Sequence, residues 1–270
     1  KSGLNDPRGQ IGVKLAVDMH MLTVSGVPVE NLLECLKRCD LEVAGLSFSG
    51  FVSGVSALME DEQKLGAAVV DFGGGSTSIA VFIRQHMIYG DAVRMGGDHI
   101  TNDICQGLRV SMDVAERIKT LHGGLLATSA DDRDLIEVPN PMAQWETDRR
   151  TVTRAELIGV MRPRVEEILE EVRARLDASG FEHLPTQRIV LTGGSSQIPG
   201  LEDMASRILG RQTRIGKPLR VQGLPQAATG PAFSAAVGLA LHASQPQDEC
   251  WDFEVPSDRL GTRRVRRAMR

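Results

Sequence analysis

The sequence predicts an α/β fold with mixed sheets, and three observations lead to this class. Continuous apolar runs at residues 65–71 and 188–192 are typical of buried strands, and each run is followed by a cluster of glycines. Residues 78–83 predict a further strand, which a turn at 84–86 joins to a return strand at 87–94. Segments with helical periodicity lie between these strands, so strands and helices are expected to be interspersed along the chain.

The segment before the first buried run is expected to contain two strands and two helices. The period-two alternation of Val13 and Leu15 predicts a strand, whereas Leu32 and Leu36 lie on one face of an amphipathic helix. The acidic residues 60–62 are expected to end the second helix in a turn. The expected elements are strands at 12–23 and 41–48 and helices at 29–39 and 50–59.

Capping signals locate two helices in the middle of the chain. Ser111 is a predicted N-cap for a helix that ends at Gly123. Thr153 and Glu156 form a capping-box pattern for a long helix, and Pro163 is expected to kink or restart that helix. The remaining expectations are an exposed loop at 128–150, a helix at 200–210, a strand pair at 213–222, a small-residue helix at 231–243 and a linker at 244–261.

Composition is typical of a globular protein without a membrane span. The chain has 270 residues, 41% of them hydrophobic and 24% charged, and no apolar run approaches the roughly 18 residues that a span requires. Aromatic residues make up only 4%, which argues against a single-stranded nucleic-acid binder built on stacking, and no nucleic-acid partner is expected. The chain begins at Lys1 without an initiator Met and is expected to be a fragment or a processed form. The four cysteines favour reduced thiols in a cytosolic protein over half of a metal site.

Positive charge is concentrated at the C-terminal end. The last twelve residues contain six arginines and no acid, whereas the rest of the chain holds 25 basic and 35 acidic residues. Val265 and Met269 lie four residues apart among these arginines, which is the spacing of a basic amphipathic helix on anionic lipid. A disordered basic end explains the pattern equally well. The candidate membrane-contacting residues are Arg263, Arg264, Val265, Arg266, Arg267 and Met269.

The most informative motif is Val-Val-Asp-Phe-Gly-Gly-Gly-Ser-Thr at residues 69–77. A buried strand brings Asp71 to its carboxyl end, and the glycines that follow allow backbone amides to surround an anion. An acid beside phosphates requires a cation, so Asp71 implies Mg²⁺, held directly or through water. A glycine-rich hairpin without a ligand is the alternative. The candidate ligand-binding residues are Asp71, Gly73, Gly74, Gly75, Ser76 and Thr77.

Three weaker signals accompany this motif. Paired glycines after the second buried run allow the backbone to approach a flat ligand closely. A Glu–Lys pair three residues apart shares one predicted helix face and is suited to ribose hydroxyls. A glycine at another predicted helix start lies where amides favour anions. Each signal alone is explained as well by an ordinary turn, surface pair or cap. The residues concerned are Gly97, Glu116, Lys119, Gly193, Gly194 and Ser195.

In this order, the elements resemble the actin-like ATPase superfamily, which includes actin, DnaK-type chaperones, sugar kinases and bacterial filament proteins. Residues 69–77 resemble its second phosphate motif, residues 191–196 its adenosine motif, and Glu116 with Lys119 the nucleoside contact of the filament members. Within the superfamily the chain resembles the FtsA family of cell-division proteins. The residues that support this narrower resemblance are Gly3–Pro7 with Gly12 and His20, 31–41, Arg162–Arg164, Arg214–Pro218 and Ala236–Leu239.

The resemblance implies two α/β lobes of ribonuclease H-like subdomains, with ATP and Mg²⁺ in the cleft between them. The superfamily's first phosphate motif has no counterpart here, so the fold is expected to be incomplete at its N-terminus. The implied divisions are 1–23 as a remnant of subdomain 1C, 24–64 and 224–243 as parts of 1A, 65–95 and 181–223 as 2A, 96–180 as 2B, 244–261 as a linker and 262–270 as the start of a membrane-targeting tail.

The resemblance also implies a function. Proteins of the FtsA family bind ATP, polymerise like actin, join other divisome proteins and tether FtsZ to the cytoplasmic face of the inner membrane at the division site. The FtsZ C-terminal peptide would dock on residues 96–180, where the basic candidates are Arg109, Arg117, Lys119 and Arg133.

Catalytic turnover is expected to be weak. Residues 47–51 contain no Gln or Glu to orient an attacking water, so we expect a nucleotide-binding scaffold and at most a weak ATPase. The alternatives within the superfamily are a small-molecule kinase and a pilus-assembly or MreB-like ATPase.

Overall fold

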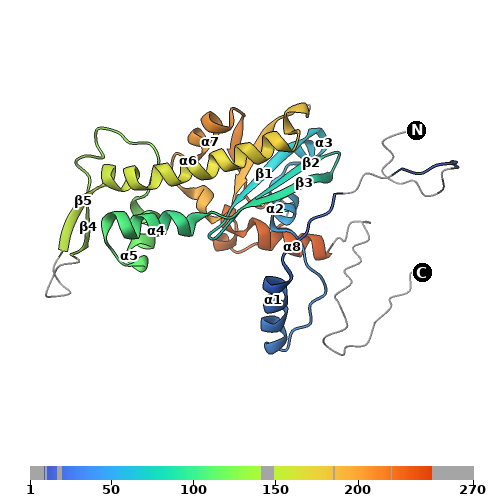
Figure 1. The fold of residues 1–270 in the computed structure, drawn as a ribbon, viewed down its shortest axis with the longest axis horizontal. Coiled ribbons are helices and arrows are strands. Elements are labelled where there is room, and N and C mark those ends of the chain that lie inside the picture. Colours follow the sequence, from blue (N-terminus) through green and yellow to red (C-terminus); the bar gives the residue numbers. More distant parts are fainter. Residues whose placement is uncertain are drawn as a thin grey trace.

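The computed structural model of the protein describes residues 9, 11–16, 20–140, 149–184, 186–219 and 221–244. A five-stranded sheet with helices on both faces forms one part, and a helical extension that ends in a two-stranded sheet forms the other (Figure 1). The α-helices are α1 Gly26–Arg38, α2 Ser49–Ala57, α3 Glu60–Leu65, α4 Gly97–Leu108, α5 Met112–His122, α6 Arg154–Ala178, α7 Leu201–Leu209 and α8 Ser234–Ser244. The strands are β1 Ala67–Phe72, β2 Thr77–Ile83, β3 His86–Val93, β4 Leu135–Pro139, β5 Arg149–Thr153, β6 Arg188–Thr192 and β7 Thr213–Ile215. Short 3₁₀ turns occur at Phe181–His183, Gly194–Gln197, Gln226–Ala228 and Pro231–Phe233.

The main sheet is mixed and has the strand order β3-β2-β1-β6-β7. Strand β1 pairs antiparallel with β2 and parallel with β6, so the predicted α/β class with a mixed sheet is confirmed. In the β1–β6 register Asp71 lies opposite Thr192. The carboxyl ends of the two buried strands therefore bring both predicted glycine clusters to the same edge of the sheet.

Alternation along the central strands divides the core between the two faces of the sheet. Ala68, Val70 and Phe72 of β1 pack into the larger cluster, whereas Ala67 and Val69 pack into the smaller one. Because successive side chains of a strand point to opposite faces, a strand buried on both faces reads as a continuous apolar run. This is why the sequence identified the central strands.

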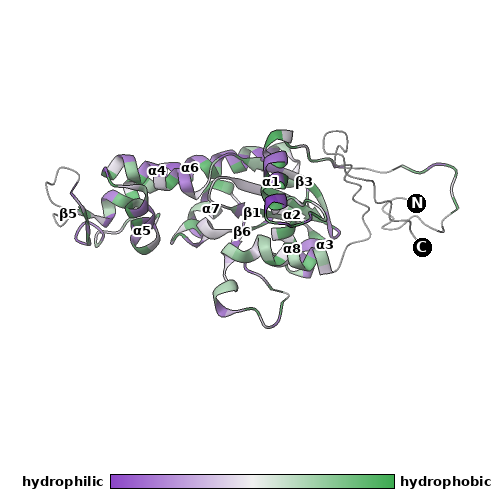
Figure 2. Ribbon diagram, turned by 90° about the horizontal axis from the view of Figure 1, so that it is seen from below, coloured by the Kyte–Doolittle hydropathy of each residue, from purple (hydrophilic) through white to green (hydrophobic). Residues whose placement is uncertain are grey.

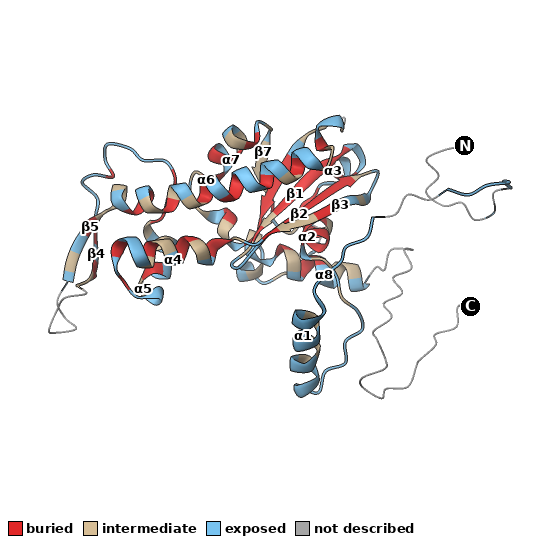
Figure 3. Ribbon diagram, in the orientation of Figure 1, coloured by how far each residue is buried: buried red, intermediate tan, exposed pale blue. Residues whose placement is uncertain are grey.

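Different helices cover the two faces. Helix α6 crosses one face and continues into the extension, while α2 and α8 lie together on the other (Figures 1 and 3). A Cβ atom at Gly238 would lie 1.8 Å from the Val52 carbonyl oxygen, so α8 and α2 touch through their backbones. Apolar residues are frequent in both helices (Figure 2). No helix in the described part of the chain is long and apolar enough to cross a membrane.

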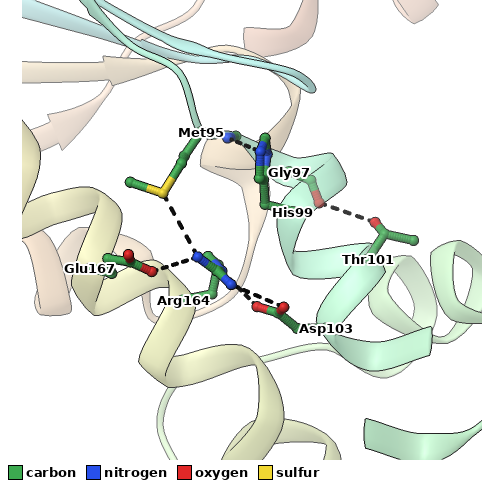
Figure 4. Close-up of polar contacts among 8 residues, drawn as sticks. Met95, Gly97, His99, Thr101, Asp103, Arg164 and Glu167 are labelled. Carbon is green, nitrogen blue, oxygen red and sulfur yellow. Dashed lines mark hydrogen bonds and ion pairs between the residues drawn. The ribbon is translucent and has the colours of Figure 1, made fainter. Parts of the chain in front are cut away.

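Ion pairs fasten the extension to α6. The Arg164 guanidinium binds Asp103 of α4 through Nε and Oδ2 at 2.6 Å and also reaches Glu167 and the Met95 sulfur (Figure 4). Arg154 binds Asp131, whose side chain is 4% exposed, at 2.8 Å. These contacts hold α4 and the segment before β4 against α6.

Two predicted strands are wrong. The described residues of 12–23, and residues 41–48, contain no strand. Val13 is fully exposed and Leu41 is 59% exposed. A strand requires a neighbouring strand to receive its backbone hydrogen bonds, and these segments pair with none among the described residues. Helix α1 forms close to its predicted position, although it has no buried residue (Figure 3).

Several local predictions also need correction. The acidic residues 60–62 begin helix α3 instead of forming a turn, because the Glu62 carboxylate accepts the Met59 amide at 2.8 Å and caps the helix start. Helix α6 continues through Pro163, so the expected restart is absent, since buried residues on both sides pack on the same core. The alternative of a kink at Pro163 stays a prediction. The predicted loop at 128–150 contains β4 and part of β5, whose alternation buries Ile136 and Val152. Among the described residues of the predicted strand pair at 213–222, only Thr213–Ile215 form a strand.

The capping predictions for the middle helices agree with the structure. Ser111 precedes α5 and Gly123 follows it. The Thr153 hydroxyl accepts the Glu156 amide, and the Glu156 carboxylate accepts the Thr153 amide, so the capping box is present. The predicted linker and C-terminal tail, 244–261 and 262–270, lie outside the described residues except for Ser244 at the end of α8.

Candidate functional site

The hairpin loop between β1 and β2 is the first element of the candidate site. The Gly73 amide donates to the Ser76 carbonyl at 3.1 Å, which closes a tight turn with Gly74 and Gly75 at its exposed tip. Within the described residues, the amides of Gly74, Gly75 and Ser76 donate to no protein group. The loop therefore offers backbone donors to an anion.

The carbonyl of Gly73 is the point where three chain segments meet. It accepts the Gly97 amide at 2.9 Å and the Ser195 hydroxyl at 3.1 Å. The Asp98 amide donates to the neighbouring Gly74 carbonyl at 2.9 Å. The two predicted glycine motifs and the predicted helix start are thus in direct contact.

The start of α4 has a different part in the site from the one that the sequence indicated. The Gly97 amide donates to the Gly73 carbonyl, so it anchors the loop between β1 and β2 and is not available to a ligand. Gly96 lies so close beneath the loop that a Cβ atom there would be 2.4 Å from the Gly74 oxygen. The His99 Nδ1 atom accepts the Gly96 amide at 3.2 Å and completes the helix start (Figure 4).

Glu116 and Lys119 of α5 form a partly enclosed pair. Their carboxylate and ammonium groups are 2.6 Å apart, and Lys119 is only 10% exposed whereas Glu116 is 54% exposed. Lys119 also donates to the Thr101 hydroxyl at 2.7 Å and to the Gly97 carbonyl at 3.2 Å. Lys119 thus connects α5 to the start of α4 and leaves the Glu116 carboxylate within reach of a ligand.

Glu116 remains ionised near neutral pH. Burial opposes its ionisation, but hydrogen bonds from Lys119 and Thr101 outweigh the burial and lower the pKa of the carboxyl group. An ionised carboxylate accepts hydrogen bonds only, which suits it to the hydroxyl groups of a sugar.

Gly193 holds the second glycine motif against the first. Its φ angle is +89°, and a Cβ atom would lie 2.5 Å from both the Asp71 Oδ1 atom and the Phe72 carbonyl oxygen. Any other residue at this position would be strained and would displace Asp71. The paired glycines after β6 thus allow the backbone to approach the acid at the end of β1.

Asp71 is a half-buried carboxylate with one hydroxyl donor. Burial raises its pKa, and the hydrogen bond from the Ser53 hydroxyl at 2.7 Å opposes that change. The described residues contain no group of three or more His, Cys, Asp or Glu side chains arranged to hold a metal ion. One carboxylate at the edge of an anion loop fits a Mg²⁺ ion that keeps most of its waters or takes further ligands from phosphate groups.

Thr77 differs from its expected contribution. The sequence suggested a hydroxyl donor to the ligand, but Thr77 is fully buried and its hydroxyl donates to the Met95 carbonyl at 2.8 Å. The hydroxyl is therefore used to fasten the hairpin to the segment before α4. Ser76 is exposed at the loop and keeps its hydroxyl available.

Comparison with known families decides the identity. A protein-family model described as "Cell division protein FtsA" matches residues 68–238, which contain both glycine motifs and the Glu–Lys pair. The chain belongs to the FtsA family.

Curated FtsA proteins support the assignment along most of the chain. The cell division protein FtsA of Rhizobium meliloti strain 1021 is 47% identical over 241 residues, which are 89% of this chain and 54% of the relative. The FtsA of Escherichia coli strain K12 is 34% identical over 249 residues, which are 90% of this chain and 58% of that protein. The chain therefore spans somewhat more than half the length of these FtsA relatives.

Solved structures confirm the actin-like ATPase fold. The structure of MreB5 of Spiroplasma citri bound to AMPPNP matches with a TM-score of 0.62 at 16% identity and covers 82% of this chain and 65% of MreB5. The PilM-PilN type IV pilus biogenesis complex matches with a TM-score of 0.60 at 19% identity, covering 81% of this chain and 58% of the matched chain. At these identities the likeness shows the fold alone.

Sequence reasoning missed two contributors to this FtsA site. Ser53 of α2 binds Asp71, and Thr101 bridges Glu116 and Lys119. Gly96, which precedes Gly97 in a Gly-Gly pair, allows the loop to lie against α4. No local pattern marks Ser53 or Thr101, since their partners lie 18 and 15 residues away in the chain.

Proposed function

We propose that this chain supplies the nucleotide-binding part of an FtsA-type scaffold, which binds ATP with Mg²⁺ and links FtsZ to the membrane. The observation that carries the proposal is the convergence of the Gly73–Ser76 loop, the Gly193–Ser195 motif and the Glu116–Lys119 pair around Gly97. The MreB5 structures with AMPPNP and with ADP add support, because their fold is the same.

Different residues would bind different parts of the nucleotide. The amides of Gly74, Gly75 and Ser76 would bind phosphate oxygens, and Asp71 would hold Mg²⁺ through water. Glu116 would accept the ribose hydroxyls, while the backbone at Gly193 and Gly194 would lie against the flat base. Mg²⁺ supplies positive charge that neutralises the phosphates.

The surroundings of Asp71 favour binding over turnover. Its hydrogen-bond partner is the Ser53 hydroxyl, and residues 47–51 hold no Gln or Glu that would orient a water. We therefore infer a scaffold with at most slow ATP hydrolysis. Membership of the FtsA family argues against the small-molecule kinase and the pilus-assembly alternatives.

The proposed partners act at other surfaces. The C-terminal peptide of FtsZ would dock on residues 96–180, where Arg109, Arg117 and Arg133 are exposed basic side chains. Self-association in an actin-like polymer or dimer and contacts with other divisome proteins would build the assembly. The arginine-rich end would bind lipid on the cytoplasmic face of the inner membrane at the division site.

Binding of fluorescently labelled ATP in the presence of Mg²⁺ tests the proposal. It would be measured in this chain and in a version extended to the length of the FtsA relatives. We expect Glu116→Ala and Gly193→Val each to weaken binding about tenfold or more, because each removes or displaces a ligand contact. Glu170→Ala is the matched control, since Glu170 is an exposed helical glutamate without a polar partner among the described residues. If the extended version fails to bind at millimolar nucleotide, the glycine motifs are structural turns and the proposal is wrong.

A further inference from the structure

Asp98 brings a second carboxylate to the loop between β1 and β2. Its backbone amide donates to the Gly74 carbonyl at 2.9 Å, and the Gly97 amide donates to the Gly73 carbonyl at the same distance, so the start of α4 is held against the loop. A Cβ atom at Gly74 would lie 3.1 Å from the Oδ1 atom of Asp98 and 3.3 Å from its Oδ2 atom. The side chain of Asp98, as well as its backbone, therefore lies beside Gly74.

This carboxylate is close to the amides that the loop offers to an anion. The Gly74 nitrogen and the Cβ position are joined through Cα by two bonds of about 1.5 Å each, so Oδ1 of Asp98 lies within about 6 Å of that nitrogen in any orientation of the N–H bond. A phosphate oxygen bound to this amide would lie about 2.9 Å from the nitrogen. The two negative groups would thus be closer than the Debye length of about 10 Å at about 0.1 M salt.

Within the described residues, no side chain pairs with this carboxylate. The side chain of Asp98 is exposed and forms no hydrogen bond or ion pair in that part of the chain. Lys119 reaches the neighbouring Gly97 carbonyl at 3.2 Å, but its ammonium group pairs with Glu116 at 2.6 Å. The positive end of the α4 dipole favours an acid in this first turn, which explains why an aspartate is stable there. Its charge still acts on any anion in the loop.

We propose that Asp98 makes the loop selective for phosphate groups that carry a divalent cation. The free amides of Gly74, Gly75 and Ser76 attract an anion, whereas the adjacent carboxylate repels an anion that brings no cation. A nucleoside triphosphate with Mg²⁺ carries less negative charge than the metal-free form, so the repulsion falls mainly on the latter. This role rests on the proposed function and differs from that of Asp71, which would hold the ion.

Binding of fluorescently labelled ATP, measured with Mg²⁺ and with a chelator, tests this selectivity. The 270-residue chain and the version extended to the length of the FtsA relatives would both be used. We expect Asp98→Asn to bind metal-free ATP about fivefold more tightly than wild type, because one like charge beside the loop is removed. Its affinity for the Mg²⁺ complex should change by less than about twofold. Asp98→Glu keeps the charge and should keep the wild-type preference for the complex.

Asp61→Asn is the matched control. Asp61 is also an exposed aspartate in the first turn of a helix, but α3 precedes β1 and the loop follows the other end of that strand. The control should therefore leave both affinities unchanged. An equal gain in metal-free binding in both asparagine variants would reflect net charge alone and would overturn the proposal.

Salt separates charge repulsion from a change in the shape of the loop. Raising the salt from about 0.1 M to about 1 M shortens the Debye length to about 3 Å, so the difference between wild type and Asp98→Asn should almost vanish. A difference that persists in high salt would come from an altered loop and would overturn the proposal. Equal metal-free affinities in low salt would also overturn it, while binding of the Mg²⁺ complex by wild type would leave the proposed function standing. If neither version of wild type binds the Mg²⁺ complex, the proposed function fails and the selectivity fails with it.

Discussion

Asp71 is the residue whose chemistry depends most on its neighbours. Its carboxylate is half-buried at the end of a central strand, with Gly193 pressed against one oxygen and the Ser53 hydroxyl bound to the other. Burial raises its pKa, so ionisation of this carboxyl group is less favourable than it is in water. In the proposed function, a Mg²⁺ ion beside Asp71 would offset this penalty.

Replacing Asp71 by Asn isolates that role. The amide keeps the shape of the side chain and can still accept from Ser53, but it carries no charge. We expect wild-type protein to bind labelled ATP about tenfold more tightly with Mg²⁺ than with a chelator, and Asp71→Asn to lose this dependence. If Mg²⁺ still strengthens binding to the variant by the same factor, Asp71 does not hold the ion.

Glu62 is a second residue whose charge contributes to stability in a way that can be measured. Its side chain is 4% exposed and binds Arg214 at 2.8 Å through Oε1. Burial opposes ionisation, but the hydrogen bonds from Arg214 and the Met59 amide prevail, and the pKa falls below its ordinary value of 4.5. Because the folded-state pKa is the lower one, the stabilisation is complete above the unfolded value. It is lost as the pH falls through the folded-state value.

Glu62→Gln should therefore destabilise the protein in a pH-dependent manner. We expect the free energy of unfolding to drop by about 2–3 kcal/mol at pH 7, because Arg214 loses its buried partner. Urea unfolding at a series of pH values measures this, and the curves of wild type and variant should converge as the pH falls through the lowered folded-state pKa of Glu62. A difference that stays constant down to pH 3 would show that the effect comes from packing and not from charge. Glu170→Gln on the exposed face of α6 serves as the control.

At the scale of elements, helices α2 and α8 pack backbone to backbone at Gly238. A Cβ atom at Gly238 would lie 1.8 Å from the Val52 carbonyl oxygen, whereas a Cβ atom at Gly159 of α6 would meet no atom within 4 Å. Both glycines are inside helices, so intrinsic helix propensity favours alanine at each. The packing alone distinguishes them.

Alanine at these two glycines should have opposite effects. We expect Gly238→Ala to lower the free energy of unfolding by about 3 kcal/mol, because α8 must move away from α2. Gly159→Ala should raise it by roughly 0.5–1 kcal/mol, since alanine reduces the backbone entropy lost on folding. Urea denaturation of both variants measures the difference. Equal effects of the two changes would mean that α8 is not packed on α2 as described.

The sequence predicts an element well when its signal is local and poorly when it depends on a distant partner. The runs at β1 and β6 were found because burial on both faces leaves only apolar residues. Alternation at 12–23 gave the same kind of signal, but no strand forms there because pairing is a property of two segments. Helix α3 was missed because Glu62 caps it from within an acidic stretch that resembles a turn.

In the candidate site, too, local signals were predicted and contacts with distant segments were not. Both glycine motifs and the Glu116–Lys119 pair stand out in the sequence, and the structure brings them together. The position of Thr77 could not be predicted, because the burial of its hydroxyl depends on the chain segment that ends at Met95. A motif identifies the residue types, while the neighbouring segments decide which atoms face the ligand.

At the scale of the whole molecule, the arginine-rich C-terminal sequence is basic, whereas the rest of the chain holds more acidic than basic residues. Positions 259–270 lie outside the described residues, so their contribution is proposed from the sequence alone. We expect the full chain to sediment with vesicles that contain anionic lipid, and a version ending at residue 258 to remain in solution. Vesicles of neutral lipid are the control. Equal sedimentation of both versions would place the lipid contact elsewhere or rule it out.

The carbonyl of Gly73 has a consequence for how the molecule responds as a unit. An oxygen has two lone pairs, and here one receives the Gly97 amide and the other the Ser195 hydroxyl, which lies 122 residues further along the chain. A shift of the Gly73 carbonyl toward a bound phosphate would stretch both bonds. We therefore expect a ligand in the loop to move α4 and the turn after β6 together. A single peptide group would thus couple ligand binding at the hairpin loop to a movement of two other segments.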